Sequence, residues 1–185
     1  MNQNSNNKPS TTKTNPTREI KALQRLSKKL GIPLDKISEE GALNLKKFYK
    51  NYDIDFILNS WFTKEFLLIK EEGNYVAKIQ TYDDDGFPQI LNWHIDFGRV
   101  EIVEGDEFIS HYSKAGFLQI GAAQNGDPLV LDLESKTIDI GYLSHEYVWG
   151  DKSIDIRKNF QKFTSFSKFI ERIINNQIIP TEYKF

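Results

Sequence analysis

Cysteine is absent from the 185-residue sequence, which also contains only three histidines. Without thiols the protein cannot form disulfides, use thiolate catalysis or hold zinc or an iron–sulfur cluster through cysteine. Any catalysis would have to come from carboxylates, hydroxyls or the histidines. The lack of cysteine also fits a reducing compartment, so a cytoplasmic location is expected.

Long hydrophobic runs are absent too. No stretch approaches the roughly 18 apolar residues that a transmembrane helix requires, so no membrane contact is expected. The opening residues, MNQNSNNKPSTTKTNPTR, lack the apolar core of a signal peptide. Residues 1–16 cannot bury enough apolar surface to offset the entropy of ordering, so they are predicted to form a flexible polar tail. Residues 17–185 are expected to form a single domain.

Positive charge is scarce in one segment. The formal net charge of the chain is −2, yet residues 82–108 carry eight acids against Arg99 alone, a local balance of −7. Such a segment repels nucleic acid, because phosphate binding depends on clustered Lys and Arg. From residue 151 onward seven basic residues outnumber four acids, and these are interpreted as the solvated surface of a helix. Nucleic acid is therefore not expected among the partners.

Hydrophobic periodicity predicts two helices ahead of a sheet. Apolar residues recur at helical spacing from Thr17 to Leu30, and a second helix is predicted from Ser38, since Glu39 and Glu40 suit a helix N-terminus. Strand patterns joined by short turns follow, which predicts an antiparallel sheet. The predicted strands lie within residues 62–70, 74–82, 90–98, 116–121, 127–133 and 137–143, and the first of them could instead form a short helix.

The chain is predicted to close with a helix packed on the sheet. Its apolar face would comprise Phe160, Phe163, Phe166, Phe169, Ile170, Ile173 and Ile174. In the strand before it, Ile138, Ile140 and Tyr142 are predicted to share one face. The expected fold class is α+β, a mostly antiparallel sheet with N-terminal helices and a C-terminal helix packed on it.

One short motif matches part of a metal-dependent nuclease. Glu134-Ser135-Lys136 has the E-x-K form in which carboxylates hold magnesium and the lysine helps to activate water. Those enzymes need both side chains on one face of a strand, whereas here the apolar alternation stops at Leu133 and restarts at Ile138. Residues 134–137 are therefore interpreted as a connection between strands, and a nuclease is the less favoured alternative.

The histidines do not form a recognisable metal motif. His145-Glu146 begins like a zinc-protease motif, but Trp149 occupies the position of the second histidine. His94 is expected on the polar face of a strand, His111 in a loop and His145 at a strand end. No catalytic, metal or cofactor site is therefore expected.

The segment FLQIGAAQNGDPLVLDLESKTIDIGYLSHEY, residues 117–147, is interpreted as paired strands. Asn125-Gly126-Asp127 predicts a tight turn, because Gly and Asn tolerate a positive φ and the Asp carboxylate can accept hydrogen bonds from nearby backbone amides. The strand after the turn ends in Leu-Asp-Leu, and a further strand leads to a His-Glu pair.

These residues, followed by FTSFSKFIERI at positions 163–173, resemble the SUKH superfamily, which includes bacterial toxin-immunity proteins and relatives of a fungal cell-wall synthesis regulator. The similarity covers roughly residues 116–173, and Asn125-Gly126 stands where the family often has a double glycine. The positions that match the family pattern are Gly121, Gly126, Asp127, Leu131, Asp132, Leu133, His145, Glu146, Ser165 and Phe166.

The resemblance implies an α+β domain without catalysis that binds and neutralises a protein toxin, commonly a nuclease or a deaminase. It also implies that the matching Asp and His residues are structural, since the family varies its partner-binding surface. A regulatory or scaffold module is the alternative within the family.

Charge then predicts where a partner binds. A nuclease toxin is basic, so an inhibitor gains from carboxylates that meet the same surface. Trp149 is a candidate aromatic anchor, since tryptophan is enriched among residues that dominate binding energy, although a core position is the alternative. The acids could also be a solvated surface, and Asp83-Asp84-Asp85-Gly86, which resembles part of a calcium loop, is interpreted as a turn. The predicted partner-binding residues are Asp83, Asp84, Asp85, Glu104, Asp106, Glu107 and Trp149.

Overall fold

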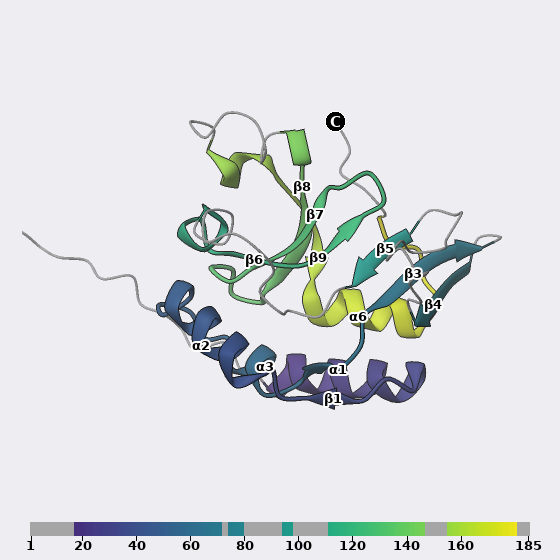
Figure 1. Ribbon diagram of the computed structural model, residues 1–185. Coiled ribbons are helices and arrows are strands. Elements are labelled where there is room, and N and C mark those ends of the chain that lie inside the picture. Colours follow the sequence, from purple (N-terminus) through teal and green to yellow (C-terminus); the bar gives the residue numbers. More distant parts are fainter. Residues whose placement is uncertain (1–16, 72–73, 80–93, 98–110, 147–154, 181–185) are drawn as a thin grey trace, which may run out of the picture.

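The computed structural model describes residues 17–71, 74–79, 94–97, 111–146 and 155–180 (Figure 1). Its helices and antiparallel strands make up the α+β fold that the sequence predicted. The first part of the chain contains α1 (Thr17–Leu30), β1 (Leu34–Asp35), α2 (Glu39–Phe48), α3 (Asp55–Leu58) and β2 (Trp61–Phe62). The rest contains β3 (Phe66–Glu71), β4 (Asn74–Ile79), β5 (His94–Phe97), β6 (Phe117–Ala123), β7 (Pro128–Asp132), β8 (Asp139–Leu143), the 3-10 helix η1 (Ile156–Asn159), β9 (Phe160–Ser165) and α6 (Phe166–Ile174).

Seven strands form one sheet in the order β4-β3-β5-β6-β7-β8-β9, and each neighbouring pair runs antiparallel. The strands predicted within residues 62–70 and 74–82 are present as the antiparallel pair β3 and β4, so the alternative of a helix at residues 62–70 is wrong. The short strands β1 and β2 form a separate ladder in which Leu34 faces Phe62 and Asp35 faces Trp61.

The first two helices form for the reasons seen in the sequence. In α1 the apolar stripe is buried, and Leu23 and Leu26 have no exposed surface. At the start of α2 the hydroxyl of Ser38 accepts a hydrogen bond from the backbone N–H of Gly41 at 3.2 Å, which caps the helix. Within the described ranges, no helix is both long enough and apolar enough to cross a membrane.

The first and last helices, α1 and α6, lie side by side below the sheet (Figure 1). Arg25 pairs with Glu171 at 3.0 Å, and the ammonium of Lys29 donates to the carbonyls of Ile173 and Ile174 at 3.0 and 2.6 Å. These contacts place the C-terminal ends of both helices together, so the helices run parallel. Lys29 also lies in the last turn of α1, and one positive charge therefore stabilises two helix C-termini.

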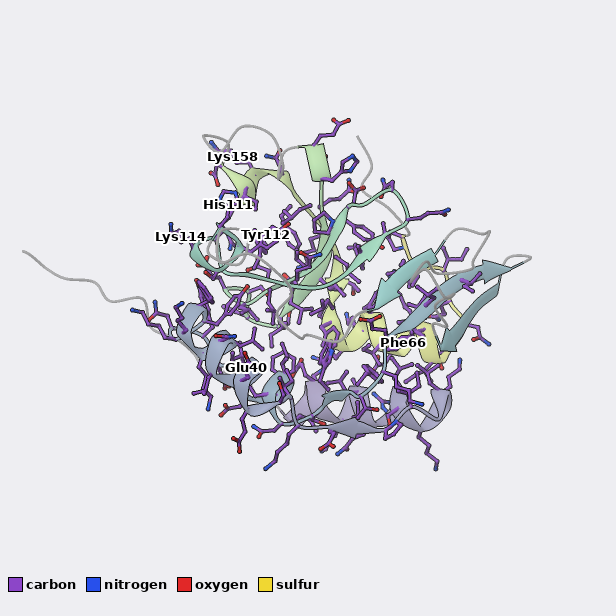
Figure 2. The ribbon with its side chains drawn as sticks, viewed as in Figure 1. Glu40, Phe66, His111, Tyr112, Lys114 and Lys158 are labelled. Carbon is purple, nitrogen blue, oxygen red and sulfur yellow. The ribbon has the colours of Figure 1, made fainter. Side chains whose placement is uncertain are left out.

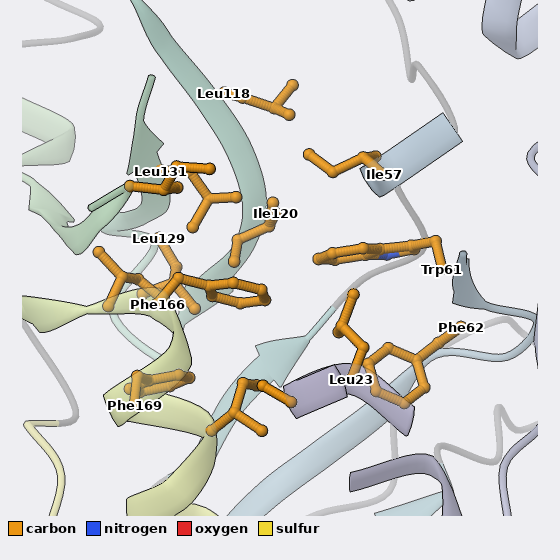
Figure 3. Close-up of a cluster of buried hydrophobic side chains, with 14 of the residues drawn as sticks. Leu23, Ile57, Trp61, Phe62, Leu118, Ile120, Leu129, Leu131, Phe166 and Phe169 are labelled. Carbon is orange, nitrogen blue, oxygen red and sulfur yellow. The ribbon is translucent and has the colours of Figure 1, made fainter. Parts of the chain in front are cut away.

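The main apolar core lies between these helices and one face of the sheet (Figure 3). Trp61 is almost fully buried and stacks on Phe166, with ring centroids 6.1 Å apart and an interplanar angle of 19°. Phe56 of α3 also packs against Phe166, so the residues between α2 and β3 cover the start of α6. The labelled core residues are Leu23, Ile57, Trp61, Phe62, Leu118, Ile120, Leu129, Leu131, Phe166 and Phe169.

A smaller apolar cluster covers the opposite face of the sheet. Its buried members are Tyr112, Phe117, Val130, Leu143 and Ile156. Residues 111–114 form a helical turn, and together with η1 they supply the cover for this face. Because both faces of the sheet are covered here, every residue of β7 and β8 is buried. In a sheet that is covered on one side only, every second residue of these strands would be exposed.

The helix predicted from Phe160 is wrong in its first half, because this segment is β9 and pairs with β8. A spacing of three residues places Phe160 and Phe163 on opposite faces of a strand. Phe160 packs on Phe117 in the smaller cluster, with ring centroids 4.8 Å apart, while Phe163 packs on Tyr142 at 5.4 Å in the main core. Burial on two faces therefore produced a spacing that resembles a helical stripe.

Two smaller predictions also need correction. Ile138 does not share a strand with Ile140 and Tyr142, because it lies in the turn before β8 with a φ of 44°. His111 does not lie in a loop but begins the helical turn of residues 111–114. In contrast, α6 begins at Ser165 and Phe166, as the motif at these positions indicates.

Candidate functional site

All the residues predicted to bind a partner lie outside the described ranges. They are Asp83, Asp84, Asp85, Glu104, Asp106, Glu107 and Trp149. The backbone of His94 belongs to β5, whereas the predicted orientation of its side chain also falls outside what is described. The candidate site that the structure does define is a polar cluster, which we call the Arg157 cluster, formed by Tyr52, Asp132, Glu134 and Arg157.

Arg157 holds two carboxylates at the end of β7. One guanidinium nitrogen, Nη2, lies 2.8 Å from Oδ2 of Asp132, and the other, Nη1, lies 3.2 Å from Oε2 of Glu134. The side chain of Asp132 is only 9% exposed, whereas those of Arg157 and Glu134 are 35% and 46% exposed. The cluster is therefore anchored on its inner side and open to solvent on its outer side.

Two further contacts fix the guanidinium of Arg157. It donates to the backbone carbonyl of Ala115 and lies over the ring of Phe117, 4.8 Å from the centroid. Asp155 caps η1 by accepting from the N–H of Arg157 at 3.1 Å, which positions the arginine at the start of this short helix. A planar guanidinium can combine stacking with several directed hydrogen bonds, which a lysine cannot do.

Two tyrosines connect the cluster to α2. The buried hydroxyl of Tyr49 donates to the carbonyl of Phe117 at 2.7 Å, and the hydroxyl of Tyr52 donates to Oε1 of Glu134 at 3.0 Å. Burial raises the pKa of Tyr49 well above its ordinary value. Burial, followed by the hydrogen bond to Glu134, also raises the pKa of Tyr52. Both hydroxyls therefore remain protonated donors at physiological pH.

Close packing around Glu134 requires a glycine at position 116. Gly116 has a φ of 74°, and a Cβ built there would lie 2.7 Å from Cγ of Glu134. The carbonyl of Gly116 accepts from the N–H of Leu133 at 2.9 Å, so the backbones are tied together at this point. The backbone at position 116 thus lies so close to Cγ of Glu134 that a residue larger than glycine would collide with it.

The contacts of Glu134 bear on the E-x-K motif. Glu134 lies in the turn between β7 and β8, as the sequence predicted, and each of its carboxylate oxygens contacts Tyr52 or Arg157. Asp132 likewise uses one oxygen for Arg157 and the other for the N–H of Glu134. Lys136 is exposed in the same turn. Over the described part of the chain, no three His, Asp or Glu residues are grouped so that they could hold a metal ion.

A second polar pair connects the Asn125-Gly126-Asp127 turn to His145, which does not lie at a strand end as predicted but begins a helical segment two residues after β8. The carboxylate of Asp127 is fully buried, and its Oδ1 lies 3.0 Å from the N–H of His145 and 2.7 Å from Nδ1 of the same residue. Asn125 donates from Nδ2 to Oδ2 of Asp127 at 2.7 Å. Gly126 has a φ of 90°, which confirms the predicted turn. The carboxylate accepts from a backbone amide as predicted, but that amide is 18 residues away.

Sequence reasoning missed the role of Arg157, which was grouped with the solvated basic residues after position 151. The structure pairs Arg157 with Asp132, and it pairs Lys162 with Asp139 at 2.6 Å. Asp132 was noted only as part of a motif, and no local pattern links it to a base 25 residues later. Figure 2 shows Lys158, the residue after Arg157, at the same end of the molecule as His111, Tyr112 and Lys114.

Comparisons of the chain with protein-family models, with curated proteins and with solved structures found no significant match.

Proposed function

We propose that this protein is a non-catalytic binding domain that neutralises a basic protein toxin of the nuclease or deaminase type. The observation that carries the proposal is the local balance of −7 between residues 82 and 108 in a chain whose overall charge is only −2. Complementary charge accelerates encounter with a basic partner and selects against acidic ones. The acids from Asp83 to Glu107 and the aromatic anchor Trp149 are the proposed contact residues.

The contacts of the motif residues support a binding role. Asp127 and Asp132 match the toxin-immunity pattern, and both use their carboxylates to hold other parts of the chain. Ser165 precedes α6, and the N–H of Phe166 donates to the carbonyl of Ile138 at 2.8 Å. These residues stabilise a scaffold, and the proposed contact residues stand in the sequence between its described elements.

The order of the sequence relates the proposed contact residues to this scaffold. Glu107 stands four positions before His111, where the helical turn of residues 111–114 begins, and Trp149 stands six positions before Asp155, which caps η1. The turn and η1 together cover one face of the sheet. The described elements that follow Glu107 and Trp149 in the sequence therefore belong to the same layer of the scaffold.

A regulatory or scaffold module is the main alternative, and it differs in having a partner that is not toxic. A magnesium nuclease that uses Glu134 and Lys136 is the less favoured alternative. Its metal ligand would have to give up the bonds of Glu134 to Tyr52 and Arg157. A cleavage assay with DNA and RNA in the presence of magnesium separates this enzyme from both binding modules. The enzyme would cleave and would lose this activity in Glu134→Ala, whereas neither binding module would cleave.

Growth rescue tests the toxin-neutralising role. The protein encoded by the gene immediately beside the gene for this chain would be expressed from an inducible promoter, with and without the chain, and colony formation would be counted. The proposal expects growth to be restored by the chain. Binding of the neighbouring protein without any effect on growth would favour a scaffold module instead.

Charge reversal tests the contact surface. One variant carries Asp84→Lys and Asp85→Lys, and another carries Asp106→Lys and Glu107→Lys. The matched control reverses Glu40 and Asp53, two exposed acids that stand apart in the sequence from every proposed contact residue, so that all three variants change the net charge equally. The proposal expects weaker toxin binding and a flatter salt dependence in the first two variants only. Equal losses in all three would reduce the effect to overall charge.

A further inference from the structure

The turn between β6 and β7 contains the only Asn–Gly step in the sequence, Asn125-Gly126. Both residues are exposed, and a Cβ built on Gly126 would meet no atom within 4 Å. No atom of the fold therefore crowds Gly126 where a side chain would stand. An asparagine followed by glycine is a reactive pair, because glycine has no side chain to hinder attack by its backbone nitrogen.

The reaction of such a pair is intramolecular. The backbone nitrogen of Gly126 attacks Cγ of Asn125, the Cγ–Nδ2 bond breaks, and ammonia leaves with the proton of the glycine nitrogen. Water then opens the five-membered imide at either of its carbonyl carbons. The products are an aspartyl and an isoaspartyl residue, so the net change exchanges one ammonia for one water and adds one negative charge.

In the folded protein three hydrogen bonds oppose this reaction. Nδ2 of Asn125 donates to Oδ2 of Asp127 at 2.7 Å, and Oδ1 of Asn125 accepts from the N–H of Asp127 at 3.2 Å. The N–H of Gly126 donates to the carbonyl of Ala123 at 2.9 Å. The attack therefore requires a local opening of the turn, which an exposed turn undergoes far more often than global unfolding.

The product would act on the buried carboxylate next to it. Nδ2 of Asn125 donates to Oδ2 of Asp127, and conversion replaces that donor by a second carboxylate. Two carboxylates cannot both remain ionised at hydrogen-bond distance without a large cost. Asp127 also holds the N–H and the ring of His145 through Oδ1, so the disturbance reaches the segment that follows β8.

We propose that Asn125 is a site of spontaneous deamidation and that its conversion releases the contact between Asp127 and His145. The fold thus carries a covalent, time-dependent change at a defined turn. This change needs no enzyme and no cofactor, and it is independent of the proposed toxin-binding role.

The first experiment follows the reaction in the intact, folded chain. The protein is incubated in mildly alkaline buffer at physiological temperature, and peptide mapping by mass spectrometry measures aspartyl and isoaspartyl products over time. Asn59 is the internal reference, because it is exposed and its side chain is also hydrogen-bonded, donating to Asp55 at 2.9 Å. The proposal expects conversion at Asn125 well before Asn59, and a several-fold slower reaction in Gly126→Ala. Conversion at Asn59 first, or none at Asn125, overturns it.

The second experiment measures the consequence. Asn125→Asp reproduces the aspartyl product uniformly, and Asn59→Asp adds the same charge at the reference position. The proposal expects Asn125→Asp to unfold at a clearly lower temperature and to shift the ring resonances of His145, while Asn59→Asp does neither. An Asn125→Asp variant that matches the parent in both measurements overturns the proposed release of His145.

Discussion

The carbonyl of Ile138 accepts a hydrogen bond from the N–H of Phe166 at 2.8 Å, so a residue in the turn before β8 satisfies a free amide at the start of α6. Ile138 has a φ of 44°, which a β-branched residue adopts only under strain. Ile138 is only 3% exposed and belongs to the main core, and this burial offsets the strain. The last helix is thus positioned by an unfavourable backbone conformation elsewhere in the chain.

Truncation of Ile138 should cost less than truncation of Ile140, although both side chains belong to the same buried core. Ile140→Ala creates a cavity beneath β8 and should destabilise by about 2–5 kcal/mol. Ile138→Ala creates a similar cavity but relieves part of the β-branched strain, which is worth about 1–3 kcal/mol at such positions. Urea unfolding of both variants measures the difference, and equal costs would show that Ile138 is not strained.

Replacement of Arg157 should leave the carboxylate of Asp132 nearly buried and without its cation. Arg157→Ala should destabilise by about 2–4 kcal/mol, since loss of one partner from a buried ion pair costs about 3–5 kcal/mol and this arginine is partly exposed. Arg157→Lys should recover only part of the loss, because one ammonium cannot serve two carboxylates and a carbonyl while stacking on Phe117.

The control for this series is Lys158→Ala, at the next position in η1. Lys158 is 81% exposed and lies 3.8 Å from Asp155, so its removal should change stability by less than about 0.5 kcal/mol. Thermal unfolding of the three variants would contradict the role of Arg157 if Arg157→Ala were as stable as Lys158→Ala.

Alanine should be tolerated worse at Gly116 than at Gly126. Both glycines have a positive φ, so each substitution pays a conformational cost of about 1 kcal/mol. At Gly126 the new methyl group meets nothing, whereas at Gly116 it collides with the side chain of Glu134. In a Glu134→Ala background, the loss of stability caused by Gly116→Ala should therefore fall to the loss caused by Gly126→Ala. A double-mutant cycle measured by urea unfolding tests this coupling, and strictly additive costs would exclude the collision.

Removal of the hydroxyl of Tyr49 should be more costly than removal of that of Tyr52. Tyr49→Phe leaves the carbonyl of Phe117 buried without its donor, a loss of about 1–3 kcal/mol. Burial raises the pKa of Tyr49, so the neutral form stabilises the fold below the ordinary tyrosine pKa, and this contribution is lost as the pH rises towards the folded-state value. Tyr49→Phe should therefore flatten the alkaline fall in stability, and Tyr52→Phe, at a more exposed site, should flatten it less. Equal alkaline curves for the parent and Tyr49→Phe would contradict this assignment.

Glu19 should make stability depend on pH in the acidic range. Its side chain lies in the first turn of α1 in a residue that is 4% exposed, and burial raises its pKa. A raised pKa means that the folded state favours the protonated form, so this stabilisation is present at low pH and is lost as the pH rises through the folded-state pKa. Glu19→Gln should therefore unfold at a higher temperature than the parent at neutral pH, but not at acidic pH.

The matching control is Glu40→Gln, since Glu40 lies in the first turn of α2 and is exposed. This variant should show no gain at neutral pH, because it loses only a favourable interaction with the helix dipole. A gain in both variants would point to overall charge rather than to the burial of Glu19.

The elements that the sequence predicted well are those set by local chemistry. Ser38 marks the start of α2, Gly126 marks a turn, and the two-residue alternation around Leu129 and Leu131 marks β7, because each signal depends on a few adjacent residues. The boundary between β9 and α6 could not be found in this way. The apolar residues of β9 pack on two different faces of the sheet, and only the partner strand β8 distinguishes that arrangement from a helical stripe.

The Arg157 cluster was beyond local reasoning for a related reason. Arg157 contacts Asp132, 25 residues earlier, and the hydroxyl of Tyr52 reaches Glu134 across 82 residues. Nothing in the spacing of these residues indicates that they meet. The buried position of Trp61 was missed as well, since the two-residue strand that contains it forms only by pairing with Leu34 and Asp35.

The parallel contact of α1 with α6 has a consequence for the order in which the chain is made. Lys29 and Ile173 are 144 residues apart, so α1 leaves the ribosome long before the helix against which it packs. The apolar stripe of α1, which includes Leu23 and Leu26, cannot be buried against α6 until α6 has been made. Contacts between residues so far apart in the sequence also form slowly. The main core therefore closes only after residues 166–174 have emerged, and until then the nascent chain exposes a hydrophobic helix to chaperones and to other unfinished chains.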